Sequence, residues 1–407
     1  MEKTKTGNDV RVRLLVRIAR ALHAYGTPSH RLEETLGVLS TALEIEAQYL
    51  VTPTSIIASI GPESEAKTIL SRVDPGETNL SKLAGLNEVI SDVITGRMMP
   101  EQAIEKTAAV ASSADPYPLW LRIFAFAAAS GTAALLFQGG VSELLLSALL
   151  GGLVGALAVL ASAAPRLASV LPAFAALIAG SVATAAAEWF SVQPFIPTLA
   201  SLIVLIPGLS LTIAMNELSH GHLVSGTARM TGALVTFLQL GLGVAVGSKI
   251  AAFAGLSATV GAEPTPLEWR WLVAALAVTA IALTVIFRAR MRRDLLPILI
   301  VAMAGYWSVR LFAEWLGPEI GLALAAFLVG ALSNALARWR SAPAAITLLP
   351  GMLLLVPGSV GFRSLDALVR NDILSGIETG FAMVLLAVSL VTGLLLANLL
   401  VPSRRLL

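Results

Sequence analysis

Apolar residues occur in long runs over most of this chain, separated by short polar turns. A helix that crosses a bilayer needs about 20 consecutive, predominantly apolar residues. Ten segments reach or approach that length, namely residues 123–142, 144–163, 167–187, 197–215, 230–254, 270–287, 295–310, 320–337, 342–362 and 379–401. The seventh is the shortest, because Asp294 and Arg310 limit it. The pattern predicts an α-helical polytopic membrane protein with about ten transmembrane helices.

The first 118 residues have a different pattern. Residues 10–25 have helical periodicity, with an apolar face and an opposite basic face; the apolar face carries Val10, Leu14, Ile18 and Leu22, and the basic face Arg13, Arg17 and Arg20. A second helix is expected from Thr27-Pro28 to about Glu46. Strands are expected at residues 49–60 and 68–73, and further helices at 80–96 and 100–112. Residues 1–118 therefore read as an N-terminal α+β domain outside the bilayer.

Composition supports this division. The 407 residues are 56% hydrophobic and 13% charged, with a mean hydropathy of +0.80, whereas a soluble protein carries about 25% charged residues. Residues 1–118 hold 12 Lys/Arg and 15 Asp/Glu, and the other 289 residues hold 16 and 11. The charge is therefore concentrated in the N-terminal part.

Several classes of function are disfavoured. The chain has no cysteine and only four histidines, so no disulfide or thiolate metal site is possible and no metal or other cofactor is expected. A net charge of +2 is too small to indicate nucleic-acid binding. The basic first twenty residues lack the apolar core of a cleaved secretory signal.

The membrane part contains an internal repeat. Pro207-Gly208 is followed eighteen residues later by Ser225-Gly226, and Pro357-Gly358 is followed at the same spacing by Ser375-Gly376, so the copies lie 150 residues apart. Upstream, the pattern Pro-x-Pro-Leu-x-x-Arg at residues 116–122 recurs at 264–270. A long internal repeat in a hydrophobic chain is typical of a duplicated transporter.

Ten spans divide into two five-span units, expected at residues 119–255 and 264–407. An odd number of spans per unit places the second unit in the membrane upside down, so the repeats should be inverted. With the N-terminal domain inside, the cytoplasmic segments carry eleven Arg/Lys and the outer segments five. The positive-inside rule therefore favours cytoplasmic termini.

The two Pro-Gly pairs are the first candidates for a substrate site. Both residues disrupt helices, and a freed backbone persists in a membrane where protein or a water-filled cavity satisfies it. Half-helix N-termini could then accept a substrate carboxylate, and open carbonyls an ammonium group; the alternative is a kink that serves packing alone. The candidate substrate-binding residues are Pro207, Gly208, Thr212, Asn216, Ser225, Gly226, Pro357, Gly358, Gly361, Ser375 and Gly376.

Ionisable residues near the span ends are candidates for proton or charge coupling. Desolvation raises the pKa of carboxylates buried in transporters, which can then relay protons; the alternative is ordinary solvation at the membrane surface. The candidates are Glu188, Glu217, Arg229 and Glu378.

Other polar residues carry weaker expectations. Asn334 and Asn398 lie within spans, where an amide typically bridges neighbouring helices. His220 and His222 are expected in a solvated loop. His23, His30, Glu33 and Glu34 lie close together in the sequence, which leaves open a hydrolytic activity of the N-terminal domain, although no nucleophile motif accompanies them.

Four segments together resemble the threonine/serine exporter family, and the resemblance covers almost the whole chain. They are residues 26–34, residues 52–56, Ile206-Pro207-Gly208, and Ser225-Gly226 with Arg229; the second unit adds residues 349–351 and 356–363. The resemblance implies a cytoplasmic domain fused to two five-span units, and secondary export of small hydrophilic metabolites driven by the proton motive force. Related systems that split the two units between proteins are associated with succinate export.

The leading hypothesis is therefore a non-enzymatic exporter of threonine, serine or similar amino acids in a bacterial inner membrane. Its expected partners are the amino acid, protons and membrane lipid. A dicarboxylate exporter is the alternative within the same class, and Arg229 with Arg363 could supply its excess positive charge. A membrane-anchored hydrolase is the alternative from another class. The N-terminal domain is expected to be a gating module that docks through its basic helix.

Overall fold

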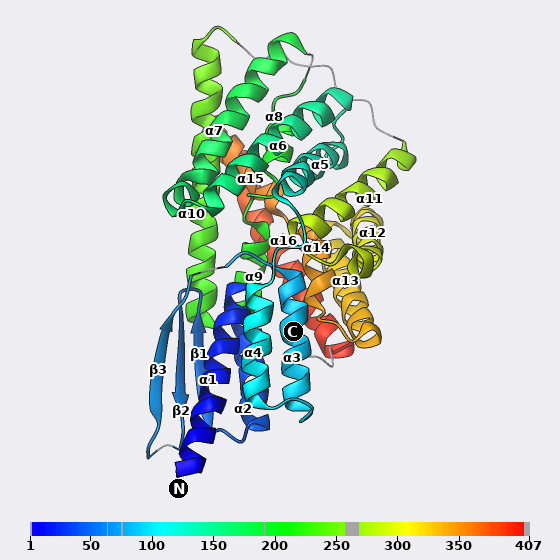
Figure 1. The fold of residues 1–407 in the computed structure, drawn as a ribbon. Coiled ribbons are helices and arrows are strands. Elements are labelled where there is room, and N and C mark those ends of the chain that lie inside the picture. Colours follow the sequence, from blue (N-terminus) through cyan, green and yellow to red (C-terminus); the bar gives the residue numbers. More distant parts are fainter. Residues whose placement is uncertain (1, 63, 75, 191, 257–267, 403–407) are drawn as a thin grey trace.

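The computed structural model describes residues 2–62, 64–74, 76–190, 192–256 and 268–402. Residues 2–112 form one end of the molecule, and twelve helices between residues 119 and 400 form a larger helical body beside it (Figure 1). We call these parts the N-terminal unit and the helical body. The near face of the helical body is the one that contacts the N-terminal unit, and the far face is opposite.

The N-terminal unit contains four helices and a three-stranded antiparallel sheet. Its elements are α1 (Glu2–Ala24), α2 (Ser29–Ala42), β1 (Ala47–Thr52), β2 (Ser55–Ile60), β3 (Lys67–Arg72), α3 (Leu80–Ile94) and α4 (Pro100–Ser112). The predicted apolar face of α1 is buried, and Arg13, Arg17 and Arg20 are exposed. Pro100 begins α4 at the position where a missing N–H costs nothing.

The prediction of one strand over residues 49–60 is wrong. The chain turns at Pro53-Thr54, and β1 pairs with β2 as a hairpin in which Thr52 faces Ser55. Proline cannot donate to a ladder of hydrogen bonds, so a strand through Pro53 is disfavoured. Alternation continues on both sides of the turn, which hides the break in the sequence pattern.

The helical body is a series of six helices that occurs twice. The first series is α5 (Leu119–Leu136), α6 (Val141–Ser162), α7 (Pro165–Trp189), α8 (Phe195–Leu202), α9 (Gly208–Ser219) and α10 (Leu223–Phe253). The second is α11 (Trp269–Ile286), α12 (Met291–Leu316), α13 (Pro318–Arg340), α14 (Ala345–Leu355), α15 (Gly358–Val369) and α16 (Ile373–Leu400). Five of the six matching pairs begin 150 residues apart, in agreement with the repeat read from the sequence.

Nine segments within the described residues are long and apolar enough to span a membrane, so the chain is a polytopic membrane protein. The fourth predicted span, residues 197–215, is instead two short helices, α8 and α9. The ninth, residues 342–362, likewise divides into α14 and α15, although Ala345–Leu368 is one of the nine apolar segments. The seventh is longer than predicted, because Asp294 does not end it: its carboxylate accepts from Arg290 N at 2.9 Å and caps the start of α12. The second copy of the Pro-x-Pro-Leu motif, at residues 264–270, lies in part outside the described residues.

Glycines set the closest helix contacts, in matching positions of both series. A Cβ on Gly243 would lie 2.3 Å from Ala173 O, and a Cβ on Gly393 would lie 2.1 Å from Ala323 O. These contacts join α7 to α10 and α13 to α16. Small residues let helix backbones approach closely in a membrane, so the repeat preserves a packing requirement.

The two series are interlocked. The half-helix α9 of the first series packs against α16 of the second, and α15 of the second packs against α10 of the first. A hydrophobic cluster also crosses from the N-terminal unit into the helical body, where it includes Leu283, Phe287 and Ile346. The N-terminal unit is therefore packed against the near face.

Candidate functional site

Both Pro-Gly pairs begin a half-helix after a break in the chain. Pro207 precedes α9 with φ −79° and ψ 35°, and Pro357 precedes α15 with φ −76° and ψ 28°. Neither helix has a side-chain cap at this end. A further Pro-Gly pair, Pro350-Gly351, lies inside α14 and does not break it.

The two breaks touch each other reciprocally. A Cβ on Gly208 would lie 2.2 Å from Val356 Cγ1 and 3.4 Å from Gly358 Cα. A Cβ on Gly358 would lie 2.6 Å from Ile206 Cγ2 and 3.5 Å from Gly208 Cα. The predicted meeting of two broken helices is thus a close-packed crossing, which only glycine fits at both positions.

A cavity of about 90 Å³ with a mostly apolar lining and a few polar side chains lies on the near side of this crossing. Thr212 and Asn216 of α9 line it, together with His30 of the N-terminal unit and with Asn334 and Asn398. Asn334 Nδ2 donates to Asn398 Oδ1 at 3.0 Å, so these amides do bridge α13 and α16. The Oδ1 atom of Asn216 is buried without a hydrogen-bond partner, although buried polar atoms are nearly always paired.

A buried ion pair fixes the N-terminal unit to α9. Glu217 is 0% exposed, and its carboxylate accepts from Arg229 Nε at 3.1 Å. It also accepts from the backbone N of Ser29 at 2.9 Å. Ser29 is the first residue of α2 and follows Pro28, which cannot cap a helix. Glu217 therefore supplies, from the helical body, the negative charge that a helix N-terminus favours.

Further contacts continue this junction. Ser29 Oγ and Ser225 Oγ share a hydrogen bond of 2.5 Å. At the first turn of α3, Leu80 N donates to Phe287 O at 3.0 Å and Ser81 N donates to Arg288 O at 3.2 Å. Backbone N–H groups at the start of α3, which have no partner within their own helix, thus donate to carbonyl groups at the end of α11. The prediction that the basic face of α1 docks the unit is wrong, because the junction is built from the starts of α2 and α3.

All four histidines of the sequence gather near this junction. The rings of His30 and His220 stack with centroids 4.8 Å apart, and His222 lies 6.2 Å from His30. His222 Nδ1 is 3.6 Å from a carboxylate oxygen of Glu33. His23 bonds the carbonyl oxygen of Thr52 at 3.2 Å. His220 and His222 lie in the turn between α9 and α10 and His220 is exposed, as expected, but this turn also faces His30.

Burial lowers the pKa of His30 to about 3, and the nearby charges of His220, Arg31, His222 and Arg229 act in the same direction. Burial also lowers the pKa of His23. The docked arrangement therefore holds both rings in the neutral form. No group of three or more His, Asp or Glu suited to a metal ion occurs among the described residues.

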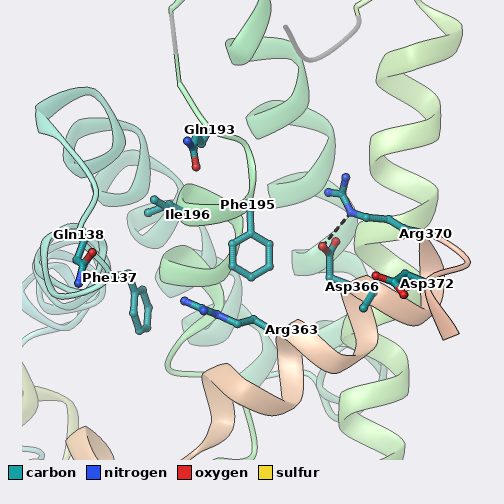
Figure 2. A pocket seen from close by; sticks show the side chains of 10 residues that line it. Phe137, Gln138, Gln193, Phe195, Ile196, Arg363, Asp366, Arg370 and Asp372 are labelled. Atoms are coloured by element: carbon teal, nitrogen blue, oxygen red, sulfur yellow. Dashed lines mark hydrogen bonds and ion pairs between the residues drawn. The ribbon is translucent and has the colours of Figure 1, made fainter. Parts of the chain in front are cut away.

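A second region of polar side chains lies at the far face. An open vestibule of about 680 Å³ is bounded by the turn after α5, the loop before α8, and α15. Figure 2 shows Arg363 extending from α15 beside Phe195 toward Phe137, with Asp366 and Arg370 joined on the other side. The Arg363 guanidinium lies 5.8 Å from the centre of the Phe195 ring.

A cavity of about 270 Å³ lies between α7, α8, α10 and α15 and adjoins the vestibule, with which it shares Phe195, Asp366 and Arg370. Thr184, Thr198 and Ser248 contribute hydroxyl groups to it, and Lys249, Asp366 and Arg370 contribute charges. None of these six residues was a candidate in the sequence analysis. The internal repeat is the sequence feature that could have identified them, because several are 150 residues away in the sequence from residues that line the near cavity.

The other candidate residues lie elsewhere. Ser225-Gly226 and Ser375-Gly376 fall in the first turns of α10 and α16, and both glycines are buried against the preceding half-helix. Gly361 packs against Met383 and Phe237. Ser375, Glu378 and Glu188 are exposed, and Ser375 N bonds the capping Asp372. Glu217 and Arg229 are the only two coupling candidates brought together in the described structure.

Arg229 and Arg363 do not form a joint anion site. Arg229 is paired with Glu217 beside the N-terminal unit, and Arg363 lies in the far vestibule. The helix α10 runs from Arg229, beside the N-terminal unit, to Lys249 at the far cavity. The two arginines are therefore separated by most of the thickness of the helical body. Twenty residues of helix rise about 30 Å.

Two family models together match most of the chain. Residues 13–251 match the family described as "Putative threonine/serine exporter", and residues 272–400 match the family described as "Threonine/Serine exporter, ThrE". No solved structure matches the chain.

Curated relatives that are similar to this chain are fungal membrane proteins. Pheromone-regulated membrane protein 10 of Yarrowia lipolytica is 28% identical over 381 residues, which cover 89% of this chain and 31% of that protein. The protein of the same name in Saccharomyces cerevisiae is 27% identical and is matched over 92% of this chain and 49% of its own length. This chain thus spans about a third to a half of such relatives. Because the first family match alone covers more than half of the sequence, the chain belongs to the threonine/serine exporter family.

Proposed function

We propose that the protein is a secondary-active exporter of small amino acids such as threonine and serine, which works by alternating access. The observation that carries this proposal is the reciprocal contact of Gly208 and Gly358, with a cavity that contains polar side chains on either side of it. A rocking motion about one close-packed crossing can open one cavity while it closes the other. Transporters built from repeats with discontinuous helices work in this way.

The positions of matching turns support an inverted arrangement of the two series. Gln138, in the turn after α5, lines the far vestibule. Arg288, in the corresponding turn after α11, contacts Glu77 and the start of α3 in the N-terminal unit. Both residues adopt a positive φ, 65° and 54°. Equivalent turns at opposite faces are what an inverted repeat requires.

The N-terminal unit serves in this proposal as a gate. Its contacts cover the near face, while the related region of the far face is an open vestibule. Positive charges favour a cytoplasmic near face, so the described conformation is closed toward the cytoplasm. In a bacterial cell the protein would lie in the inner membrane with both termini inside. Glu217 is our candidate for coupling, because its carboxylate binds both Arg229 and the backbone N of Ser29.

The charges of the far vestibule favour an amino acid over a dicarboxylate. Arg363 and Arg370 are matched there by Asp366 and Asp372. A dianion is bound best by an excess of positive charge, whereas a zwitterion needs both signs. Succinate-type export is therefore the second candidate.

Transport into and out of proteoliposomes tests the proposal. Purified protein should move radiolabelled threonine or serine down its gradient, and an imposed proton gradient should drive accumulation. Succinate should compete weakly. Transport of succinate without transport of either amino acid would establish the second candidate, and transport of none of the three would refute both.

A further inference from the structure

The two cavities on either side of the Gly208–Gly358 crossing are equivalent places in the two series. Residues that line them correspond at a spacing of 150: Gly180 with Gly330, Thr184 with Asn334, Pro194 with Ala344, Thr198 with Leu348, Val244 with Leu394, and Ser248 with Asn398. The half-helix that completes each cavity comes from the other series. Asn216 of α9 lines the near cavity, and Asp366 of α15 lines the far cavity.

Asn216 and Asp366 stand eight residues after Gly208 and Gly358 respectively. The fold thus presents one polar side chain to each cavity from the same turn of each broken helix. In the near cavity this side chain is a neutral amide, and in the far cavity it is a carboxylate. Equivalent positions in the two cavities therefore differ in charge.

The far cavity combines the groups that a small zwitterion needs. Asp366 is 20% exposed, and its Oδ2 accepts from Arg370 Nε at 2.9 Å. Arg370 is 68% exposed and its guanidinium has five donors, so one bond to Asp366 leaves others for a carboxylate. Lys249 adds a second cation. A carboxylate has about four acceptor sites, so Asp366 can hold an ammonium group beside Arg370.

The hydroxyl groups of the cavity favour a ligand that donates hydrogen bonds. Thr198 Oγ1 donates to Pro194 O at 2.7 Å, and Ser248 Oγ donates to Ala245 O at 3.1 Å. Because both protons are used within their own helices, the oxygens remain as acceptors. The volume of about 270 Å³ lies near the lower limit of about 300 Å³ for small-molecule pockets, so the ligand is small.

We propose that this cavity is a binding site for a small zwitterionic α-amino acid, in which Asp366 binds the ammonium group and Arg370 with Lys249 binds the carboxylate. The proposal rests on the proposed export function and names its release site. Thr184, Thr198 and Ser248 would accept from the ammonium group or from a side-chain hydroxyl. The near cavity has about 90 Å³ and is lined by three amides and Arg31, with no carboxylate among its described lining residues, so it would hold the same ligand more weakly.

Binding of radiolabelled L-serine and L-threonine to the full-length protein in detergent tests this site. N-acetylthreonine lacks the ammonium charge, and threonine methyl ester lacks the carboxylate charge. We expect both analogues to compete at least about tenfold less well than threonine, since a hydrogen bond to a charged group contributes about 1.5–3 kcal/mol. Equal competition by either analogue would overturn the proposal.

Asp366→Asn and Arg370→Gln should each weaken binding of threonine about tenfold or more. Asp366→Asn should also abolish the preference for threonine over N-acetylthreonine, whereas Arg370→Gln should abolish the preference over the methyl ester. This split would not arise from loss of folding. Asp366→Glu and Arg370→Lys keep the charges and should retain most of the binding if the neutral variants fail to fold.

The matched control is the exposed ion pair of Arg270 with Glu268 at the start of α11. Glu268→Gln and Arg270→Gln make the same charge changes and should leave the affinity within about twofold of the wild type. Threonine transport that survives Asp366→Asn and Arg370→Gln at unchanged KM would refute this site and leave the export function intact. Absence of threonine and serine transport by the wild-type protein would refute the export function itself.

Discussion

The near and far faces of the helical body are built from equivalent elements but differ in what covers these elements. At the near face, the turn after α11 and the half-helix α9 are covered by α2 and α3, with Glu217 fully buried. At the far face, the turn after α5 and the half-helix α15 surround an open vestibule. The repeat therefore gives two similar entrances, and the N-terminal unit makes them unequal.

The largest expected effect comes from Glu217, which holds the near face closed. Glu217→Ala removes the partner of Arg229 and the cap of α2, and we expect a loss of about 3 kcal/mol in stability. Glu217→Gln keeps one acceptor and should lose roughly half as much, about 1.5 kcal/mol. Thermal unfolding of the purified protein and proteolysis of the N-terminal unit would measure the two effects.

Glu105→Gln changes an exposed carboxylate of α4 and is the control for charge alone. If Glu217→Ala left both the thermal midpoint and the proteolysis rate at wild-type values, the near face would not depend on this ion pair. The covering of the near face by the N-terminal unit would then depend on other contacts.

The second prediction concerns the crossing between the faces. Gly208→Ala forces a methyl group to within 2.2 Å of Val356 Cγ1 and should reduce stability by about 1–3 kcal/mol. Val356→Ala in the same chain removes the clash and should restore most of the loss. Transport and thermal unfolding of the single and double variants would measure this coupling.

Gly232→Ala is the matched control, because a Cβ there has no neighbour within 4 Å. Replacement of glycine by alanine in a helix interior favours the helix by about 0.5–1 kcal/mol, so this variant should be at least as stable as the wild type. Independent effects of Gly208→Ala and Val356→Ala would contradict the contact.

The smallest effect should be seen with His30, and it should depend on pH. The docked pKa is about 3 and the ordinary value is 6.5, so docking is fully stable above pH 6.5 and weakens as the pH falls toward 3. His220, His222, Arg31 and Arg229 disfavour the added charge, and Glu33 and Glu217 lie in the same cluster. Hydrogen exchange of α2 between pH 7 and pH 5 would follow the release of the N-terminal unit.

His30→Gln should cost about 1 kcal/mol of stability at pH 7, because it loses one hydrogen bond to Asn216. Its hydrogen exchange should depend less on pH, with a remainder due to His23. Unchanged pH dependence in this variant would assign the response to other groups.

The repeat was predictable from sequence because its landmarks are local. Pro-Gly and Ser-Gly keep their spacing, and the elements that they begin keep the same order. The number of long spans was less predictable, since hydropathy does not change at residues 203–207, where α8 and α9 separate. Hydropathy reports burial in lipid, and the break depends on backbone geometry.

The composition of the sites was less predictable, because it depends on contacts between distant segments. Ser29 and Ser225 are 196 residues apart, and His30 lies against His220 only after the N-terminal unit has docked. No local pattern links such residues. Thr212 and Asn216 were candidates because they follow the first break, whereas Asp366 was not a candidate although it occupies the same place after the second break.

The exchange of half-helices between the two series has a consequence for biosynthesis. Besides α10 of its own series, α9 packs against α16, which is synthesised after it. A nascent chain that stops before residue 373 would leave α9 without this neighbour, and α9 is too short to span a bilayer alone. Packing of the first series can therefore be completed only after α16 has been synthesised.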